Sequence, residues 1–317
     1  MDSAANPPPL PPNAFRFQDL ELEEPPFYAS GHSFLYKLRN HPSLIFKARA
    51  HPLEYRLQLA AEACAVLPRQ EVFTLTKEND WYFMGFTMDL ARPLDPLIVR
   101  PEQRQAIADS MINAVETLHE KGIVHGDIKL ENMLLDEKGS VLLCDFAEAR
   151  VMGEDEDEWE GQTTWHYISP ARRRKIESLG SIPPPVPEDD MYGLGLSIWA
   201  LYTKRVPLED IALDDIALGE VLLKGETVDV SAVTDEPARE RIKELLRKGG
   251  ARVHESASLL NRLLVPFATY LAQRQLRPSQ QAPLETFVKV LNFNILDGSA
   301  LAFVAGSFAA TRIQSQR

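Results

Sequence analysis

Cysteine, long apolar runs and positive charge are all scarce in this sequence, and each shortage argues against a class of protein. Only Cys64 and Cys144 occur among 317 residues, both within apolar patterns, which predicts free buried thiols rather than a disulfide-rich secreted domain. The longest membrane-like stretch, residues 300–310, is too short to span a bilayer, and the proline-rich start of the chain lacks the apolar core of a signal peptide. The net charge of −12 argues against nucleic acid and anionic membranes as partners. We therefore expect an intracellular protein, in the cytoplasm or the nucleus.

The composition is that of a folded globular protein. Hydrophobic residues make up 44% of the chain and charged residues 25%, so a substantial core can form. The length suits one two-lobed domain or two small domains, and no internal repeat is visible.

The stretch from Ile123 to Arg150 is the one around which the rest of the chain is organised. It predicts a strand, a loop, a second strand, a turn and a third strand, with polar residues at the ends of apolar runs. Asp127, Lys129 and Asn132 lie on one loop, and Asp145 directly follows an apolar run. Buried strands that end in this way bring carboxylates to a cleft.

These four polar residues match the needs of a magnesium–nucleotide site. Asn132 stands five residues after Asp127, and Asp145 stands eighteen residues after Asp127. One carboxylate orients a hydroxyl group, while the amide oxygen and the other carboxylate hold Mg²⁺ against phosphate oxygens. Lys129 neutralises charge on the phosphoryl group that moves.

The pattern resembles the protein kinase superfamily. His125-Gly126-Asp127 stands where that family has His-Arg-Asp, and Asp145-Phe146-Ala147 stands where it has Asp-Phe-Gly. The resemblance implies an α+β, bilobal fold, with a small β-rich N-lobe that holds one main helix and a larger helical C-lobe. It also implies ATP and Mg²⁺ (or Mn²⁺) as cofactors and a serine or threonine of a protein as the acceptor.

Small-molecule phosphotransferases of the choline and aminoglycoside kinase type share the HGD, asparagine and DF pattern. Two further segments favour the protein kinase branch. Residues 162–171 resemble the family's Gly-Thr-x-x-Tyr-x-Ala-Pro-Glu, and residues 190–195 resemble Asp-x-Trp-Ser-x-Gly at the start of the central C-lobe helix.

The segment from Ser30 to Lys37 resembles a degraded glycine-rich loop. The only glycine present, Gly31, is off register, while Ser33 fills a glycine position and Leu35 fills the valine position. Glycine lets backbone N–H groups approach phosphates closely, so its loss argues against tight phosphate binding. These three residues are nevertheless the expected nucleotide contacts of this loop.

Residues 44–47 form a short apolar strand that ends in lysine and match the family's Val-Ala-Ile-Lys. The match implies that Lys47 contacts the α- and β-phosphates, and that the bulky Ile45 lies over the adenine and narrows the pocket. A helix is predicted over 53–67, in which Glu62 is the expected ion-pair partner of Lys47. Glu54 is the second candidate, although it follows the lysine by only seven residues.

The predicted domain boundaries follow from this alignment of motifs. Residues 1–26 are expected to form a flexible proline-rich tail, residues 27–92 the N-lobe, and residues 93–317 the C-lobe. Apolar spacing predicts further helices, and the last segment is expected to pack on the lower lobe. These helices cover residues 101–121, 211–223, 236–248 and 254–275, and the last segment is 284–317. The proline-rich residues 183–187 read as an exposed insertion.

Departures from the family pattern bear on regulation. Gly126 replaces the arginine that receives a phosphate on the activation segment, so switching by such phosphorylation is not expected. Ala147 restricts a backbone flip after Asp145-Phe146, and Ala171 removes a structural ion pair. The acidic run 154–160 suits basic substrates, and the basic run 172–175 reads as a substrate-side or structural patch.

Three functions stay open at this point. The first is an active, divergent serine/threonine kinase, in which Asp127 and Lys129 are catalytic and Asn132 and Asp145 hold the metal. The second is a pseudokinase that binds or scaffolds without phosphate transfer, which the degraded glycine loop supports. The third is a small-molecule phosphotransferase. The sequence does not indicate an oligomeric state.

Overall fold

The structure, a computed structural model, describes residues 8–29, 33–153, 163–209 and 215–253. The chain divides into a unit of residues 1–255 and a unit of residues 256–317, and every described residue belongs to the first. The predictions for Gly31, for the acidic run 154–160 and for the helices beyond residue 253 therefore lie outside the described part of the chain.

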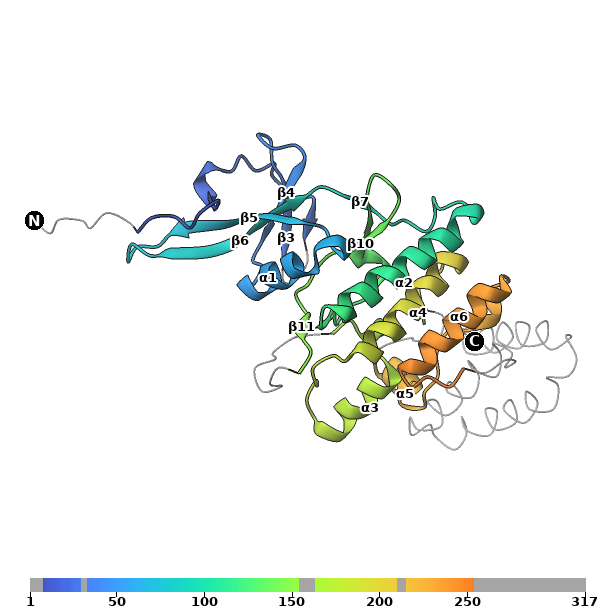
Figure 1. Ribbon diagram of the computed structural model, residues 1–317. Coiled ribbons are helices and arrows are strands. Elements are labelled where there is room, and N and C mark those ends of the chain that lie inside the picture. Colours follow the sequence, from blue (N-terminus) through green and yellow to red (C-terminus); the bar gives the residue numbers. More distant parts are fainter. Residues whose placement is uncertain (1–7, 30–32, 154–162, 210–214, 254–317) are drawn as a thin grey trace, which may run out of the picture. The chain divides into compact units, whose positions relative to one another are not determined.

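The first lobe is built on a six-stranded sheet in the order β1-β5-β6-β4-β3-β2 (Figure 1). β1 runs parallel to β5, and the other neighbours pair antiparallel. The strands are β1 (Phe15–Arg16), β2 (Tyr28–Ala29), β3 (Phe34–Lys37), β4 (Leu44–Ala48), β5 (Pro68–Leu75) and β6 (Trp81–Asp89). Together with one helix they form the β-rich lobe that the kinase resemblance implies.

The central strand β4 is covered on both faces, which determines where Lys47 points. Successive side chains of a strand point to opposite faces of the sheet. Ile45 packs with Val66, Phe86 and Met88 on one face, whereas Phe46 packs in a different cluster on the other. Lys47 therefore points to the same face as Ile45, which is the face that carries the helix α1.

The segment before β2 belongs to the lobe, so the prediction of a flexible tail up to residue 26 is wrong for its described part. Its apolar side chains cover the Phe46 face of the sheet, where Leu20 is buried, and β1 adds a strand beside β5. Further out, the indole nitrogen of Trp81 donates to the carbonyl oxygen of Pro8 at 2.9 Å. The sequence suggested a tail because of the proline-rich run at residues 7–12, a composition typical of disordered segments.

The helix of this lobe, α1 (Pro52–Ala61), is separated from β4 by three residues. His51 caps it by accepting the Leu53 N–H on Nδ1 at 3.2 Å, and Pro52 occupies the first turn, where a missing N–H is harmless. The helix ends before Glu62, whose φ of +46° is not helical, and a 3₁₀ turn follows at Glu62–Cys64. The predicted helix over 53–67 was therefore too long.

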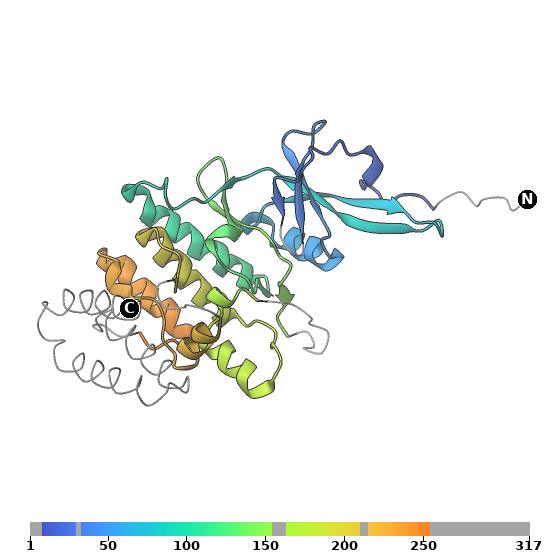
Figure 2. The same cartoon turned by 180° about the vertical axis from the view of Figure 1, so that it is seen from behind.

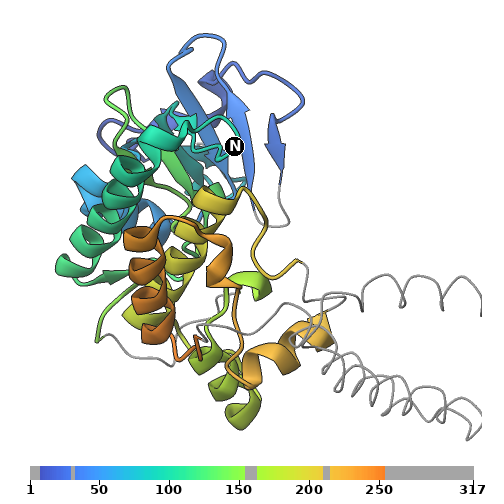
Figure 3. The ribbon, with the colours of Figure 1, turned by 90° about the vertical axis from the view of Figure 1, so that its right-hand side faces the viewer.

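The second lobe is helical. Its helices are α2 (Arg104–Glu120), α3 (Pro170–Leu179), α4 (Pro187–Thr203), α5 (Asp215–Leu223) and α6 (Glu236–Lys248). The bounds of α6 agree with the prediction, and α4 is buried along most of its length. Figure 1 shows α2, α4 and α6 side by side, and the view from behind in Figure 2 and the side view in Figure 3 agree with this.

Short strands join the lobes and frame the site. β7 (Arg92–Pro93), β9 (Met133–Leu135) and β10 (Val141–Leu143) form one small sheet, and β8 (Ile123–Val124) pairs with β11 (Arg150–Val151). Further 3₁₀ turns lie at Phe17–Asp19, Pro101–Gln103, Leu130–Asn132, Trp165–Tyr167 and Val230–Ala232. None of the helices in the described part of the chain combines the length and apolar character that a bilayer-spanning segment needs.

The proline-rich residues 183–187 are not the exposed loop that their composition suggested. Pro185 is buried, and Pro187 is the first residue of α4. Pro185 packs directly over the backbone of Gly126, as the next section describes.

Candidate active site

The loop between β8 and β9 is held in place by the carboxylate of Asp190 in α4. Asp190 is 1% exposed, and its two oxygens accept the backbone N–H groups of His125 and Gly126, each at 2.8 Å. His119, from the end of α2, lies 2.8 Å from the same carboxylate. Because buried acids are stable only when such donors surround them, Asp190 fixes the backbone that presents Asp127.

Asp127 is held by three side chains at once. Asn132 Nδ2 donates to its carbonyl oxygen at 2.8 Å and to Oδ2 at 2.9 Å. Lys129 Nζ lies 2.7 Å from Oδ2, and the Thr164 hydroxyl donates to Oδ1 at 2.7 Å. Burial would lower the pKa of Lys129, but the carboxylates of Asp127, Asp145 and Glu131 together raise it, so Lys129 is a cation at neutral pH. The structure thus brings together Asp127, Lys129 and Asn132, as the sequence predicted.

Lys47 lies between two carboxylates. Its ammonium group, in a residue only 3% exposed, forms an ion pair with Glu54 of α1 and donates to Asp145 Oδ1 at 2.5 Å. Burial alone would lower the pKa of Lys47, but the charges of Glu54 and Asp145 together raise it. Burial raises the pKa of Glu54 despite Lys47, whereas the nearby ammonium groups lower the pKa of Asp145 against the effect of burial.

The ion-pair partner predicted for Lys47 was Glu62, and this is incorrect. Glu62 stands at the end of α1, where its side chain is 70% exposed and its carboxylate lies 3.1 Å from Lys121 Nζ. Glu54, the second candidate, takes the place instead, because α1 begins so soon after β4 that its first turn already faces Lys47.

The other predicted nucleotide contacts lie on the sheet beside Lys47. Leu35 of β3 is the direct cross-strand neighbour of Lys47, Ile45 is buried on the same face, and Ser33, just before β3, is also buried. Gly31 is outside the described residues. Leu35 and Ile45 therefore form an apolar surface next to the ammonium group, of the kind on which a planar base can lie.

The predicted metal ligands fit a divalent cation that prefers oxygen. The amide nitrogen of Asn132 is used by Asp127, which leaves its oxygen for a cation, and Asp145 supplies a carboxylate. The two are adjacent through the backbone, since the Cys144 N–H donates to the Asn132 carbonyl oxygen at 3.0 Å. No cluster of three or more His, Cys, Asp or Glu side chains suited to a metal occurs among the described residues.

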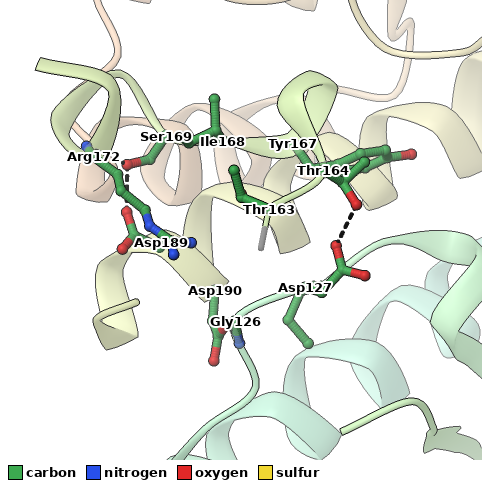
Figure 4. A pocket seen from close by; sticks show the side chains of 11 residues that line it. Gly126, Asp127, Thr163, Thr164, Tyr167, Ile168, Ser169, Arg172, Asp189 and Asp190 are labelled. Carbon is green, nitrogen blue, oxygen red and sulfur yellow. Dashed lines mark hydrogen bonds between the residues drawn. The ribbon is translucent and has the colours of Figure 1, made fainter. Parts of the chain in front are cut away.

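Next to Asp127 lies a small hollow with a buried arginine on its wall. Gly126, Asp127, Thr163, Thr164, Arg172 and Asp189 are among its lining residues (Figure 4). The sequence analysis placed Arg172 in a substrate-side or structural basic patch and gave no individual role to Thr164 or Asp190. Thr164 and Asp190 fall on the two motif segments that resemble kinases, so a signal for both existed; Arg172 had none.

The two-lobed α+β fold and the arrangement of the site are of the kind that the kinase resemblance implies, and comparison with known proteins gives the family. The protein kinase domain model matches residues 72–262, which is more than half of the chain, so this protein belongs to the protein kinase family. The match begins after Lys47 and Glu54, so the position of these two residues comes from the structure alone.

Several protein kinases are similar in sequence. A serine/threonine-protein kinase of Toxoplasma gondii is 33% identical over 171 residues, which is 50% of this chain and 28% of that protein. A probable receptor-like protein kinase of Arabidopsis thaliana is 27% identical over 206 residues, 61% of this chain and 57% of that protein. The serine/threonine-protein kinase PrkC of Bacillus subtilis is 26% identical over 154 residues, 46% of this chain and 23% of that protein. The similarity thus covers less than two thirds of each relative.

Proposed function

We propose that this protein transfers the γ-phosphoryl group of ATP to a serine or threonine hydroxyl of a protein substrate, with Mg²⁺ or Mn²⁺ as cofactor. The observation that carries the proposal is the Glu54–Lys47–Asp145 arrangement, because it joins a phosphate-binding cation of one lobe to a metal-binding acid of the other. Two of the relatives are serine/threonine-protein kinases, which supports serine and threonine as acceptors.

Each side chain has a role that follows from its position. Asp127 orients the acceptor hydroxyl and takes its proton while the hydroxyl oxygen bonds to the γ-phosphorus and the bond to the leaving ADP oxygen breaks. The Thr164 hydroxyl already donates to Asp127 at 2.7 Å, which is the contact that a substrate hydroxyl would make. Lys129 stabilises charge on the phosphoryl group, and Lys47 holds the α- and β-phosphates.

Asn132 and Asp145 would hold the divalent cation. When bound, the cation neutralises the charge of the phosphates. Leu35, Ile45 and Ser33 would contact the nucleotide, together with Gly31. We infer an intracellular location and a basic protein substrate from the sequence, and these two points remain predictions.

The direct test is phosphate transfer by the pure protein and by Asp127→Asn. The variant should lose at least about 100-fold in kcat, since a positioned base contributes about 100- to 10,000-fold. Asp109→Asn, an exposed acid of α2, is the matched control and should keep full activity. Retained activity in Asp127→Asn would contradict the mechanism.

Nucleotide binding separates the kinase from the pseudokinase. ATP with Mg²⁺ at about 100 times its Kd should stabilise the protein by about 2.7 kcal/mol, and Asp145→Ala should abolish the metal-dependent part. Binding without transfer to any protein or small-molecule acceptor would favour a pseudokinase scaffold, and transfer only to amino alcohols or sugars would favour a small-molecule phosphotransferase.

A further inference from the structure

No side chain fits at position 126, where kinases carry the arginine that binds an activation-segment phosphate. Gly126 has φ +81°, a conformation that L residues rarely adopt. A Cβ atom there would lie 2.5 Å from the carbonyl oxygen of Glu148 and 2.9 Å from Cγ of Pro185. The loop around Pro185 thus fills the space through which an arginine side chain would leave the backbone.

A different arginine enters the same hollow from the opposite side. Arg172, in the first turn of α3, is 3% exposed, and Figure 4 shows its guanidinium beside Asp189 and directed toward Gly126. Nε and Nη2 both donate to the carbonyl oxygen of Pro183, at 3.1 and 3.0 Å. One side chain therefore links the start of α3 to the proline-rich loop.

Carboxylates of the chain itself act on this guanidinium. Burial lowers the pKa of Arg172, and Asp189, Glu148, Asp190 and Asp127 oppose that effect, so the guanidinium is charged at neutral pH. With four acids around one buried cation, the surroundings repel a phosphate rather than attract it.

The same acids hold the neighbouring loops. Asp189 accepts the Ser169 hydroxyl and the Val186 N–H, the latter at 2.9 Å, and Ser169 Oγ in turn accepts the Arg172 N–H at 2.9 Å. Asp190 holds the backbone of the catalytic loop through two N–H groups. The network therefore connects the segment that ends at Ser169 to the loop of Asp127.

We propose that Arg172 is a positioning residue that fixes the 163–172 segment against the catalytic loop, so that the active site is assembled without any phosphate on the activation segment. This deepens the proposed function, on which its catalytic consequence rests. The assembly itself can be measured without any activity.

The test uses the full chain, freed of phosphate by a phosphatase and checked by mass, as wild type, Arg172→Met, Arg172→Lys and Arg174→Met. Arg174 is the matched control, because it lies on the same helix but is exposed. Hydrogen exchange is read in peptides covering residues 163–176 and 123–128, with α2 as the internal reference. We expect slow exchange in phosphate-free wild type, at least about tenfold faster exchange in both peptides of Arg172→Met, and no change in Arg174→Met.

Arg172→Lys keeps the positive charge but not the two donors that bond to Pro183, so its peptides should show protection from exchange between that of wild type and that of Arg172→Met. If Arg172→Met fails to fold, the comparison of Arg172→Lys with wild type replaces it. In transfer assays Arg172→Met should lower kcat at least about tenfold while the Kd for Mg-ATP stays within about twofold. Equal exchange in Arg172→Met and Arg174→Met, or fast exchange in phosphate-free wild type that phosphorylation slows, would overturn the proposal. Protected peptides in a wild type that transfers no phosphate would support it and contradict the proposed function instead.

Discussion

Lys47 and Asp145 are 98 residues apart in the sequence, yet Lys47 Nζ donates to Asp145 Oδ1 at 2.5 Å. Since Lys47 also pairs with Glu54, one buried ammonium group lies between two carboxylates from different parts of the fold. If either acid is removed, the Lys47 ammonium group still pairs with the other acid. If Lys47 is removed, Glu54 and Asp145 lose their shared cation, and the negative charge of each disfavours ionisation of the other.

The pairing of Lys47 with Glu54 rather than Glu62 predicts a clear contrast between two isosteric variants. Glu54→Gln removes a buried charge that orients Lys47, so kcat/KM should fall at least about tenfold, the equivalent of about 1.4 kcal/mol. Glu62→Gln removes an exposed pair with Lys121 and should change kcat/KM less than twofold, because surface ion pairs contribute about 0–1 kcal/mol. Steady-state kinetics with a protein substrate measures both, and a larger loss in Glu62→Gln would contradict the structure.

The shifted pKa of Asp145 predicts a dependence of stability on acid. The folded-state pKa lies below the ordinary value of 3.8, so the ionised Asp145 stabilises the fold above that value and the contribution is lost as the pH falls through the folded-state pKa. The difference in unfolding free energy between wild type and Asp145→Asn should therefore be constant above about pH 5 and shrink below about pH 4. Urea unfolding of both proteins at pH 6, 4 and 3 measures this, and a difference that grows toward pH 3 would contradict the Lys47 contact.

Two glycines with similar backbone angles should respond differently to alanine. Gly122 and Gly126 have φ +74° and +81°, but a Cβ at Gly122 meets nothing within 4 Å. Gly122→Ala should cost about 1 kcal/mol of backbone strain, whereas Gly126→Ala adds the contact with the Glu148 carbonyl oxygen and should cost about 3 kcal/mol. Denaturant unfolding measures both losses of unfolding free energy. Equal losses would show that the loop around Pro185 moves to accommodate the added methyl group.

The inclusion of the residues before β2 in the lobe predicts a loss of stability on truncating Leu20. Leu20 is 9% exposed within the cluster around Phe46, so Leu20→Ala should lower the unfolding free energy by about 2–3 kcal/mol. Leu97→Ala is the control, because Leu97 is 66% exposed and should change stability by less than about 0.5 kcal/mol. No effect of Leu20→Ala would restore the description of this segment as a flexible tail.

The part of the site on the catalytic loop was predictable because its residues are close in sequence. Asp127, Lys129 and Asn132 share one loop, and Asp145 follows after the two short strands β9 and β10. This short spacing in the sequence already determines that the four residues lie close together. The kinase family and the two-lobed α+β fold, which the domain match confirms, follow from the same motif.

The parts that failed depend on backbone angles and burial that spacing does not encode. Glu62 was preferred over Glu54 because it is the only acid in the body of the predicted helix and Glu54 follows Lys47 by only seven residues, but the chain leaves the helix at Glu62 with φ +46°. Arg172 was assigned to a basic run because four cations follow one another, and only the packing of α3 shows that the first of them is buried.

The short connection between β4 and α1 has a consequence for how the site forms during folding. Glu54 follows Lys47 by seven residues, whereas Asp145 follows it by 98. Because the entropy of loop closure grows with the logarithm of loop length, the first pair closes at a cost about 2 kcal/mol lower than the second. The Lys47–Glu54 contact therefore adds little to the contact order and forms with the sheet and α1, while the Lys47–Asp145 contact waits for the helical lobe. A partly folded chain would already hold Lys47 in place before Asp145 arrives.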